Sequence, residues 1–389
     1  MRMRIQMTHR TSAETGITPT APGFPDVSES AIERVQTTII DWFAATARPL
    51  PWRAEGTSAW AVLVSEIMSQ QTPVSRVAPR WSEWLERWPT PADLAAAPTA
   101  EVLQRWDRLG YPRRALRLQE AARVIADDHD NQVPDTAAAL EALPGIGAYT
   151  AAAVASFAHG ERTTVLDTNV RRVLIRVFAG RDRPTVSPSR RETVWAEQFV
   201  PATDHVAWNA GVMEFGALVC TARSPKCEEC PLADICAWNL AGRPVSASKP
   251  KTQKWAGTDR QLRGAIMDVL KAAHAEAAEA GDRSTSVVEG VSVAESSSAA
   301  DGSSVVEGAA SAAAGRRSAA TDAVAVDLFT APTADLDDEC LAALGPATSV
   351  KLTTMRDLSA DADRISRLIA DLVTDGLAHR SGDRLSLPR

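Results

Sequence analysis

The chain has 389 residues, 45% of them hydrophobic, so it is long enough for two or three domains. Its apolar stretches are too short to span a bilayer and its first residues lack the apolar core of an export signal, so we expect a cytoplasmic protein without a membrane segment. The net charge of −7 divides into +1 for residues 31–255 and −8 for residues 256–389, so the first part can still bind nucleic acid.

Helices dominate the expected fold from residue 28 to residue 241. Residues 1–27 are polar and Pro-rich and are predicted to form a disordered tail. After them, apolar residues recur at helical spacing and no strand pattern competes. Helices are predicted at residues 33–44, 61–69, 92–97, 114–127, 136–143, 150–158 and 170–178. This part is therefore predicted to be an all-α domain.

Glu66 is a carboxylate in a mostly apolar segment, with Val62, Leu63, Ile67 and Met68 around it. Burial in such surroundings disfavours the charged form, which suits a general acid near neutral pH. A glutamate on the solvated side of an amphipathic helix would give the same local pattern. The segment therefore offers a candidate acid and leaves that alternative open.

The segment Leu143-Pro-Gly-Ile-Gly-Ala-Tyr-Thr150 lies between two expected helices. Gly145 and Gly147 permit a tight turn with close backbone approach, and the N–H groups of the next helix then point outward. These features are typical of a helix-hairpin-helix, which holds a sugar-phosphate backbone without reading sequence. A plain turn is the alternative.

About twenty residues further on, Asp167 follows a short apolar run and precedes a helix. It is either an N-cap carboxylate or a carboxylate held beside the phosphate site. Nearby arginines could meet phosphates or form an ordinary solvated surface. The groups concerned are Arg113-Arg114, Arg171-Arg172, Arg181, Arg183 and Arg190-Arg191.

Four of the five cysteines, Cys220, Cys227, Cys230 and Cys236, fall within seventeen residues, separated by six, two and five residues. In a reducing compartment such a cluster indicates metal ligation rather than disulfides. A structural zinc site usually needs two short-gap pairs, and only Cys227 and Cys230 form one. One wrapping loop with uneven gaps favours a [4Fe–4S] cluster, with zinc as the alternative.

The C-terminal part is expected to be a small winged-helix-like module. Residues 242–258 form a linker, residues 259–283 hold its first helix, centred on 260–273, and residues 324–389 hold the remainder. A second helix is predicted at 359–373, followed by a hairpin that turns at Ser381-Gly382-Asp383. Residues 284–323 repeat Ser-Val-Val-Glu-Gly and are predicted to be a disordered insertion.

The hairpin, Asp167 and the four-cysteine loop at 220–236 together resemble the iron–sulfur DNA glycosylases related to endonuclease III. Further motifs narrow the resemblance to the MutY-type adenine DNA glycosylases and cover residues 28–241: Leu50-Pro-Trp-Arg53, Ser65-Glu66, Gln70-Gln71-Thr72, Leu109-Gly-Tyr111 and Asp167-Thr-Asn169. The resemblance implies a two-lobed helix-hairpin-helix glycosylase fold. It also implies a monomeric, nucleoid-associated enzyme that excises adenine paired with 8-oxoguanine or guanine in double-stranded DNA.

The resemblance further implies roles for single residues. Glu66 would protonate adenine and later help to activate water, while Asp167 would stabilise or trap the oxocarbenium-like sugar. Tyr149 and Asn169 would orient these two groups. Positions that correspond to the base pocket are Trp52, Arg53 and Val74, and positions that enter the base stack are Gln71 and Tyr111. Expected phosphate contacts are Gly145, Gly147, Arg223 and Lys226.

Tyr149 stands where bifunctional relatives carry a lysine that forms a Schiff base with the sugar. Without that amine, the chain is predicted to release a base and leave an abasic site. The sequence departs from the family at Ser69, Thr168 and Ala210, and we find no Nudix-like domain in its C-terminal part. Two alternatives stay open: a G:T or G:U mismatch thymine/uracil glycosylase, and a non-catalytic iron–sulfur DNA-binding protein.

Overall fold

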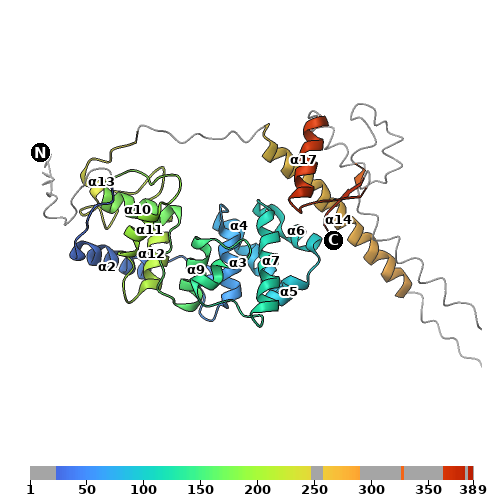
Figure 1. The fold of residues 1–389 in the computed structure, drawn as a ribbon, viewed down its shortest axis with the longest axis horizontal. Coiled ribbons are helices and arrows are strands. Elements are labelled where there is room, and N and C mark those ends of the chain that lie inside the picture. Colours follow the sequence, from blue (N-terminus) through green and yellow to red (C-terminus); the bar gives the residue numbers. More distant parts are fainter. Residues whose placement is uncertain (1–22, 247–256, 290–325, 328–361, 382–383, 389) are drawn as a thin grey trace, which may run out of the picture. The chain divides into compact units, whose positions relative to one another are not determined.

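The computed structural model describes residues 23–246, 257–289, 326–327, 362–381 and 384–388. Helices make up most of these residues (Figure 1). The chain divides into two compact units. The first consists of Met1–Ala95 and Glu120–Lys251, and the second of Ala96–Gln119 and Thr252–Arg389.

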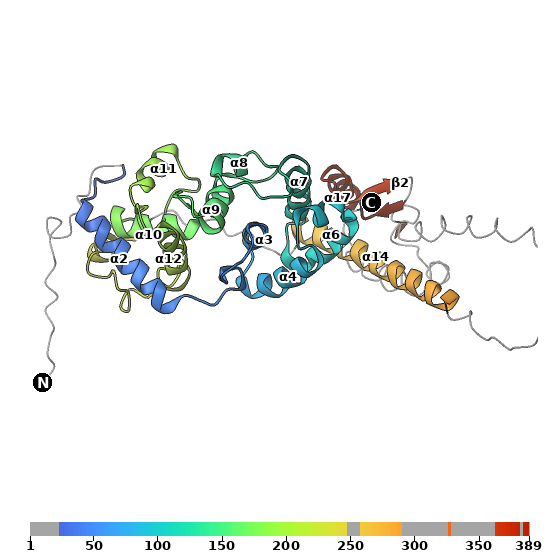
Figure 2. The ribbon, with the colours of Figure 1, turned by 90° about the horizontal axis from the view of Figure 1, so that it is seen from below.

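One half of the first unit is a bundle around α12 (His205–Leu218). This helix packs against α2 (Glu29–Thr46) and α10 (Thr168–Ala179), as Figures 1 and 2 both show. The helices α11 (Arg190–Glu197) and α13 (Ala237–Leu240) complete the bundle. Their shared core includes the fully buried rings of Phe178, Phe199 and Phe215. Burial of these apolar side chains is the main force that holds the bundle together.

The other half of the first unit is built around α3 (Ala59–Ser69), in which every residue from Trp60 to Met68 is buried. It packs against α4 (Val74–Arg87) and α9 (Ala148–His159). The small residues of α9 allow this close approach. The surrounding elements are η1 (Pro51–Arg53), α5 (Pro91–Ala96), α8 (Ala137–Glu141) and the second part of α7 (Arg113–Asp128).

The seven helices predicted for this part are all present, with ends moved by a few residues. The predicted disordered tail is wrong for its last five residues, 23–27. Phe24 stacks on Trp195 with ring centroids 4.8 Å apart, and the Trp195 indole N–H donates to the Pro25 carbonyl oxygen at 2.9 Å. Apolar burial of Phe24 therefore orders this segment. Residues 1–22 lie outside the described residues.

The second unit contains α6 (Thr99–Trp106), η2 (Asp107–Leu109), the start of α7, α14 (Asp259–Glu289) and α17 (Ala362–Thr374). Three short strands, β1 (Val326–Asp327), β2 (His379–Ser381) and β3 (Arg384–Ser386), form an antiparallel sheet in the order β1-β3-β2. In its register Arg380 pairs with Leu385. Both ribbon views show α17 beside α14. The antiparallel pairing of β2 with β3 confirms the predicted hairpin, and the winged-helix-like arrangement stays a prediction.

The second unit differs from expectation in three respects. Helix α14 runs to Glu289 and so extends into the predicted insertion. The strand β1 was not predicted. Residues 96–119, which the predicted domain boundaries assign to the glycosylase domain, belong instead to the same compact unit as α14. The remaining predicted insertion, residues 290–323, lies outside the described residues. Within the described ranges, no helix has the length and apolarity that crossing a bilayer requires.

Candidate active site

A cleft of roughly 1490 Å³ opens in the first unit. Its walls come from η1, α3, α4, α9, α10 and α12. Among its lining residues are seven of the predicted site residues: Trp52, Arg53, Glu66, Val74, Tyr149, Asp167 and Asn169. It exceeds the roughly 300–1,000 Å³ of an ordinary small-molecule pocket, so it has room for a nucleotide with part of its backbone.

Glu66 is buried on α3, with 9% of its surface exposed. The pKa of its carboxyl is raised from the ordinary 4.5 to about 7: burial is the main cause, Asp167 adds to the rise, and Tyr149 and Arg53 oppose it. The solvated position that the sequence left open is therefore wrong. A carboxyl with this pKa can hold a proton near neutral pH and release it to a base.

Tyr149 lies in the first turn of α9, immediately after the glycine hairpin. Its phenol Oη donates a hydrogen bond to Oε2 of Glu66 over 2.9 Å. Burial and the two neighbouring carboxyls raise the pKa of Tyr149 well above 10, so the phenol stays neutral and keeps its proton. The hairpin itself needs glycine at Gly145, whose φ is 74°, and both Gly145 and Gly147 lie at the surface.

Asp167 is the N-cap of α10. Its Oδ1 accepts from the Val170 backbone N–H at 2.6 Å, and its Oδ2 accepts from Nδ2 of Asn169 at 2.8 Å. Burial raises the pKa of Asp167, while these donors and the charge of Arg172 lower it. The N-cap alternative is therefore confirmed, and the same side chain also lines the cleft; its place beside a phosphate site stays a prediction.

Asn169 connects this carboxylate to the loop that carries the cysteines. Its Oδ1 accepts from Nη2 of Arg172 at 2.8 Å, and Nε of Arg172 donates to the Cys220 carbonyl oxygen at 2.8 Å. The contact depends on Gly216, because a Cβ built there would lie 2.7 Å from the Cβ of Asn169. Any larger residue at Gly216 would displace Asn169 and with it the support of Asp167.

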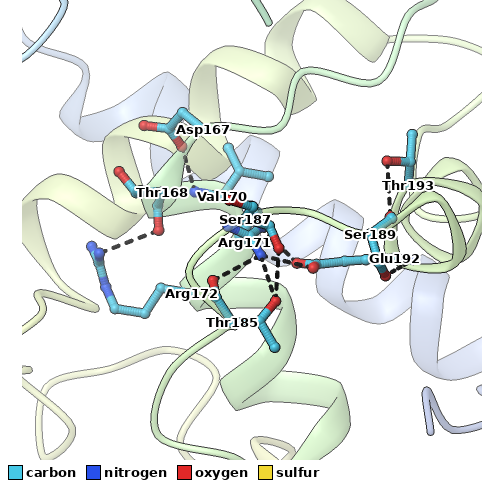
Figure 3. Close-up of polar contacts among 10 residues, drawn as sticks. All are labelled: Asp167, Thr168, Val170, Arg171, Arg172, Thr185, Ser187, Ser189, Glu192 and Thr193. Carbon is cyan, nitrogen blue, oxygen red and sulfur yellow. Dashed lines mark hydrogen bonds and ion pairs between the residues drawn. The ribbon is translucent and has the colours of Figure 1, made fainter. Parts of the chain in front are cut away.

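Arg171 points from α10 toward Glu192 and Thr185 (Figure 3) and is not among the residues that line the cleft. Its guanidinium forms a two-pronged ion pair with Glu192, at 2.7 and 2.8 Å, and donates to the Thr185 carbonyl oxygen. Arg171 and Glu192 are only 3% and 4% exposed at their side chains. The expectation that Arg171 and Arg172 could meet phosphates is therefore wrong, because both guanidinium groups are occupied inside the protein.

Glu214 on α12 also lines the cleft, and the sequence did not single it out. Its carboxylate binds Arg48 through Nε at 2.6 Å and Arg53 through Nη2 at 3.1 Å. Although burial opposes the charge, hydrogen bonds from the two guanidinium groups lower the pKa of Glu214 to about 2. The only sequence signal was a lone carboxylate in the otherwise apolar run of α12.

The four predicted cysteine ligands line one small cavity, whose other walls include Val177, Phe215 and Trp238. No three of the His, Cys, Asp and Glu side chains in the described ranges are arranged to hold a single metal ion. Burial raises the pKa of the Cys230 thiol to about 11 and that of Cys236 to about 12, so a bound metal centre would be needed to hold them as thiolates. Arg176 adds a positive charge, with Nη1 3.4 Å from Sγ of Cys220. An all-thiol, mostly apolar cavity with a nearby cation fits an anionic [4Fe–4S] centre.

The remaining predicted residues lie outside the cleft lining. Arg223 and Lys226 belong to the loop between Cys220 and Cys227, where Arg223 is exposed. Gln71 follows α3, and Tyr111 belongs to the second unit. Gln71 and Tyr111 have positive φ values of 55° and 47°, a left-handed conformation that costs such residues energy and is enriched at functional sites.

Comparisons with known proteins agree with this geometry. Residues 64–198 match the HhH-GPD superfamily of base excision DNA repair proteins, and residues 220–236 match the iron–sulfur binding domain of endonuclease III. The adenine DNA glycosylase of Mycolicibacterium smegmatis is 52% identical over 233 residues, 60% of this chain and 79% of the relative. That of Mycobacterium tuberculosis is 49% identical over 239 residues, 61% and 78% of the two chains.

The human adenine DNA glycosylase is 40% identical over 222 residues, which cover 55% of this chain and 40% of the human one. Among solved structures, a thermostable thymine-DNA glycosylase is similar with a TM-score of 0.52 and 28% identity, covering 56% of this chain and all of that one. The sequence relatives, the cleft and the four-cysteine loop lead to one conclusion. This chain belongs to the adenine DNA glycosylase family and is a DNA N-glycosylase with a [4Fe–4S] cluster.

Proposed function

We propose that this enzyme removes adenine paired with 8-oxoguanine or guanine, as a monomer acting on double-stranded DNA at the nucleoid. The supporting observation is the pair of carboxyls, Glu66 and Asp167, on the walls of one cleft and in different surroundings. Glu66 has one side-chain hydrogen-bond donor, a neutral phenol, whereas Asp167 has a backbone and an amide donor. Two carboxyls with different hydrogen-bond donors suit acid-assisted cleavage of a glycosidic bond.

The target adenine cannot react inside the duplex, so it must rotate into the cleft. Trp52, Arg53 and Val74 would then surround the base. The exposed hairpin at Gly145 and Gly147 would hold the sugar-phosphate backbone, with further phosphate contacts from Arg223 and Lys226. Gln71 and Tyr111 would enter the stack that the adenine leaves. The cluster would hold the loop that carries Arg223 and Lys226 and would take no part in bond cleavage.

In the chemical step, Glu66 gives its proton to a ring nitrogen of adenine. The bond between the base and the sugar C1′ then breaks, and its electron pair leaves with the protonated base. Asp167 stabilises the positive charge that develops on the sugar or traps it transiently. Water then adds to C1′ and gives a proton to the Glu66 carboxylate, which leaves an abasic site and restores the acid. The Tyr149 phenol cannot form a Schiff base, so the strand stays uncut.

The test uses purified protein and four duplexes that carry 8-oxoguanine:A, G:A, G:T or G:U, followed by alkali to cleave abasic sites. We expect alkali-dependent cleavage at the adenine of the first two duplexes only. Cleavage of G:T or G:U at a comparable rate would support the thymine/uracil alternative. Binding without cleavage of any duplex would support the non-catalytic alternative. Strand cleavage without alkali, or efficient trapping by borohydride, would contradict the monofunctional mechanism.

A further inference from the structure

The C-terminal module, comprising α14, α17 and the three strands, is firmly attached to the segment Ala96–Gln119. Nζ of Lys271 donates to the Asp107 carbonyl oxygen at 2.9 Å, and Nη1 of Arg113 lies 3.2 Å from Oδ1 of Asp375. The helices α6 and α14 also pack against each other. Buried apolar residues from the two sides are Val102, Leu103, Trp106, Ile266, Met267 and Leu270. The module is therefore part of the structure that presents this segment.

Tyr111 lies in the turn between η2 and α7 of that segment, where hydrogen bonds fix the backbone. Its φ of 47° is unfavourable for an aromatic residue, so surrounding contacts must hold it. The preceding Gly110 carbonyl oxygen accepts two hydrogen bonds, from Nε1 of Trp106 and Nη2 of Arg114, each at 2.9 Å. The backbone is thus fixed, while Tyr111 remains 40% exposed.

Arg260, in the first turn of α14, lies over this exposed ring. Its Cζ is 4.5 Å from the ring centroid of Tyr111, whereas Cζ of Arg114 is 5.8 Å from it. Both distances allow attraction between a guanidinium and the face of the ring. Arg114 belongs to the same segment as Tyr111, but Arg260 comes from the C-terminal module. The nearer cation therefore links the module to the orientation of the tyrosine ring.

We propose that Arg260 is a positioning residue through which the C-terminal module sets the Tyr111 ring for insertion beside the mispair. This inference rests on the proposed function, because it takes Tyr111 as a residue that enters the base stack. A ring held in place before binding loses less freedom on insertion, so the complex with a mispair is tighter. Arg260 acts only through Tyr111, and the bond-breaking step is independent of it.

The test compares Arg260→Ala and Arg260→Lys with a matched control, Arg367→Ala. Arg367 belongs to the same module, its side chain is 60% exposed, and it pairs with Asp259, so its removal costs one cation but no contact with the ring. Affinity is measured for a duplex in which 8-oxoguanine faces a non-cleavable 2′-fluoro analogue of deoxyadenosine, and for an undamaged duplex. Single-turnover rates are measured with 8-oxoguanine:A at saturating enzyme.

For Arg260→Ala we expect the Kd for the mispaired duplex to rise about two- to fivefold. The Kd for undamaged DNA should stay at the wild-type value, because no ring is inserted there. The saturated rate should also stay unchanged, because the ring is already inserted in the bound complex and takes no part in bond breaking. Arg260→Lys should recover part of the affinity, and Arg367→Ala should behave as wild type. In a Tyr111→Ala background, Arg260→Ala should cause no further loss of affinity for the mispaired duplex. This double variant keeps the proposal testable even where Arg260→Ala lowers the melting temperature.

Three results would overturn the inference. An equal loss of affinity for mispaired and undamaged DNA would make Arg260 a general phosphate contact. The same loss in Arg367→Ala would make the effect one of net charge, and additive losses in the double variant would separate Arg260 from Tyr111. Failure of the proposed function is a different outcome, because the wild-type protein would then not excise adenine from 8-oxoguanine:A at all.

Discussion

Two glutamates that line the same cleft from different helices are both buried, yet they hold protons very differently. Glu66 on α3 has a pKa of about 7, whereas Glu214 on α12 has a pKa of about 2. Glu66 is paired with a neutral phenol, and Glu214 is paired with two guanidinium groups. The charge of the partner, rather than burial alone, therefore decides which carboxyl can act as an acid.

The largest effect is expected for Glu66→Gln. This change removes the proton donor but keeps the shape of the side chain, so single-turnover excision should fall by about 10²–10⁴-fold. Binding of a mispaired duplex should change little, because Glu66 makes no phosphate contact in the proposed mechanism. Rates within about threefold of wild type would exclude Glu66 as the general acid.

The second prediction concerns Glu214→Gln. Arg48 and Arg53 would lose their charged partner but are 35% and 25% exposed at their side chains, so we expect a loss of about 2–3 kcal/mol, below the cost for a fully buried pair. The folded-state pKa of Glu214, about 2, lies below the ordinary 4.5. The stability that the ionised Glu214 gives the folded protein is therefore fully present above pH 4.5 and is lost as the pH falls toward 2.

Urea denaturation at several pH values measures both effects. Wild type should lose more stability than Glu214→Gln as the pH falls from 4.5 toward 2, over the range in which the protein still unfolds reversibly. Parallel stability profiles for the two proteins would show that the Glu214 carboxylate is not the group responsible.

The third prediction, for Tyr149→Phe, tests how the phenol partner sets the pKa of Glu66. The phenol donates to the Glu66 carboxylate and so lowers its pKa. Wild-type kcat/KM should fall above about pH 7, where Glu66 loses its proton. Removing the donor should move this alkaline limb upward by roughly 0.5 to 1 on the pH scale. A limb that moves to lower pH would contradict the assignment of Glu66 as the titrating group.

The smallest effect is expected for a charge outside the cleft. Arg223→Ala should weaken DNA binding by a few-fold and lower the dependence of log Kd on log salt by about one. The saturated single-turnover rate should stay unchanged, since Arg223 is exposed on the cysteine loop. Arg80→Ala, which removes a surface cation that pairs with Glu83, is the control. Equal salt dependence in both variants would argue against a specific phosphate contact at Arg223.

Most of the site predictions rest on local patterns in the sequence. Glu66 lies within one strongly apolar helix, Asp167 at a helix start, and the cysteines in one short loop, so each signal needed only neighbouring residues. Glu214 was missed because its environment is made by Arg48 and Arg53, which lie far from it along the chain. The contact between Arg260 and Tyr111 was missed for the same reason. No periodicity reports such long-range pairs.

The N-cap role of Asp167 has a consequence for mutational tolerance. Most replacements would remove the acceptor for the Val170 backbone N–H as well as the carboxylate, and the lost cap alone costs about 1 kcal/mol. Asparagine, serine and threonine are exceptions, because their side-chain oxygens can still cap α10 while the negative charge is lost. Under the proposed mechanism, Asp167→Asn, Asp167→Ser and Asp167→Thr would therefore remove the carboxylate but keep a cap for α10, so inactive but stable variants are readily accessible at this position.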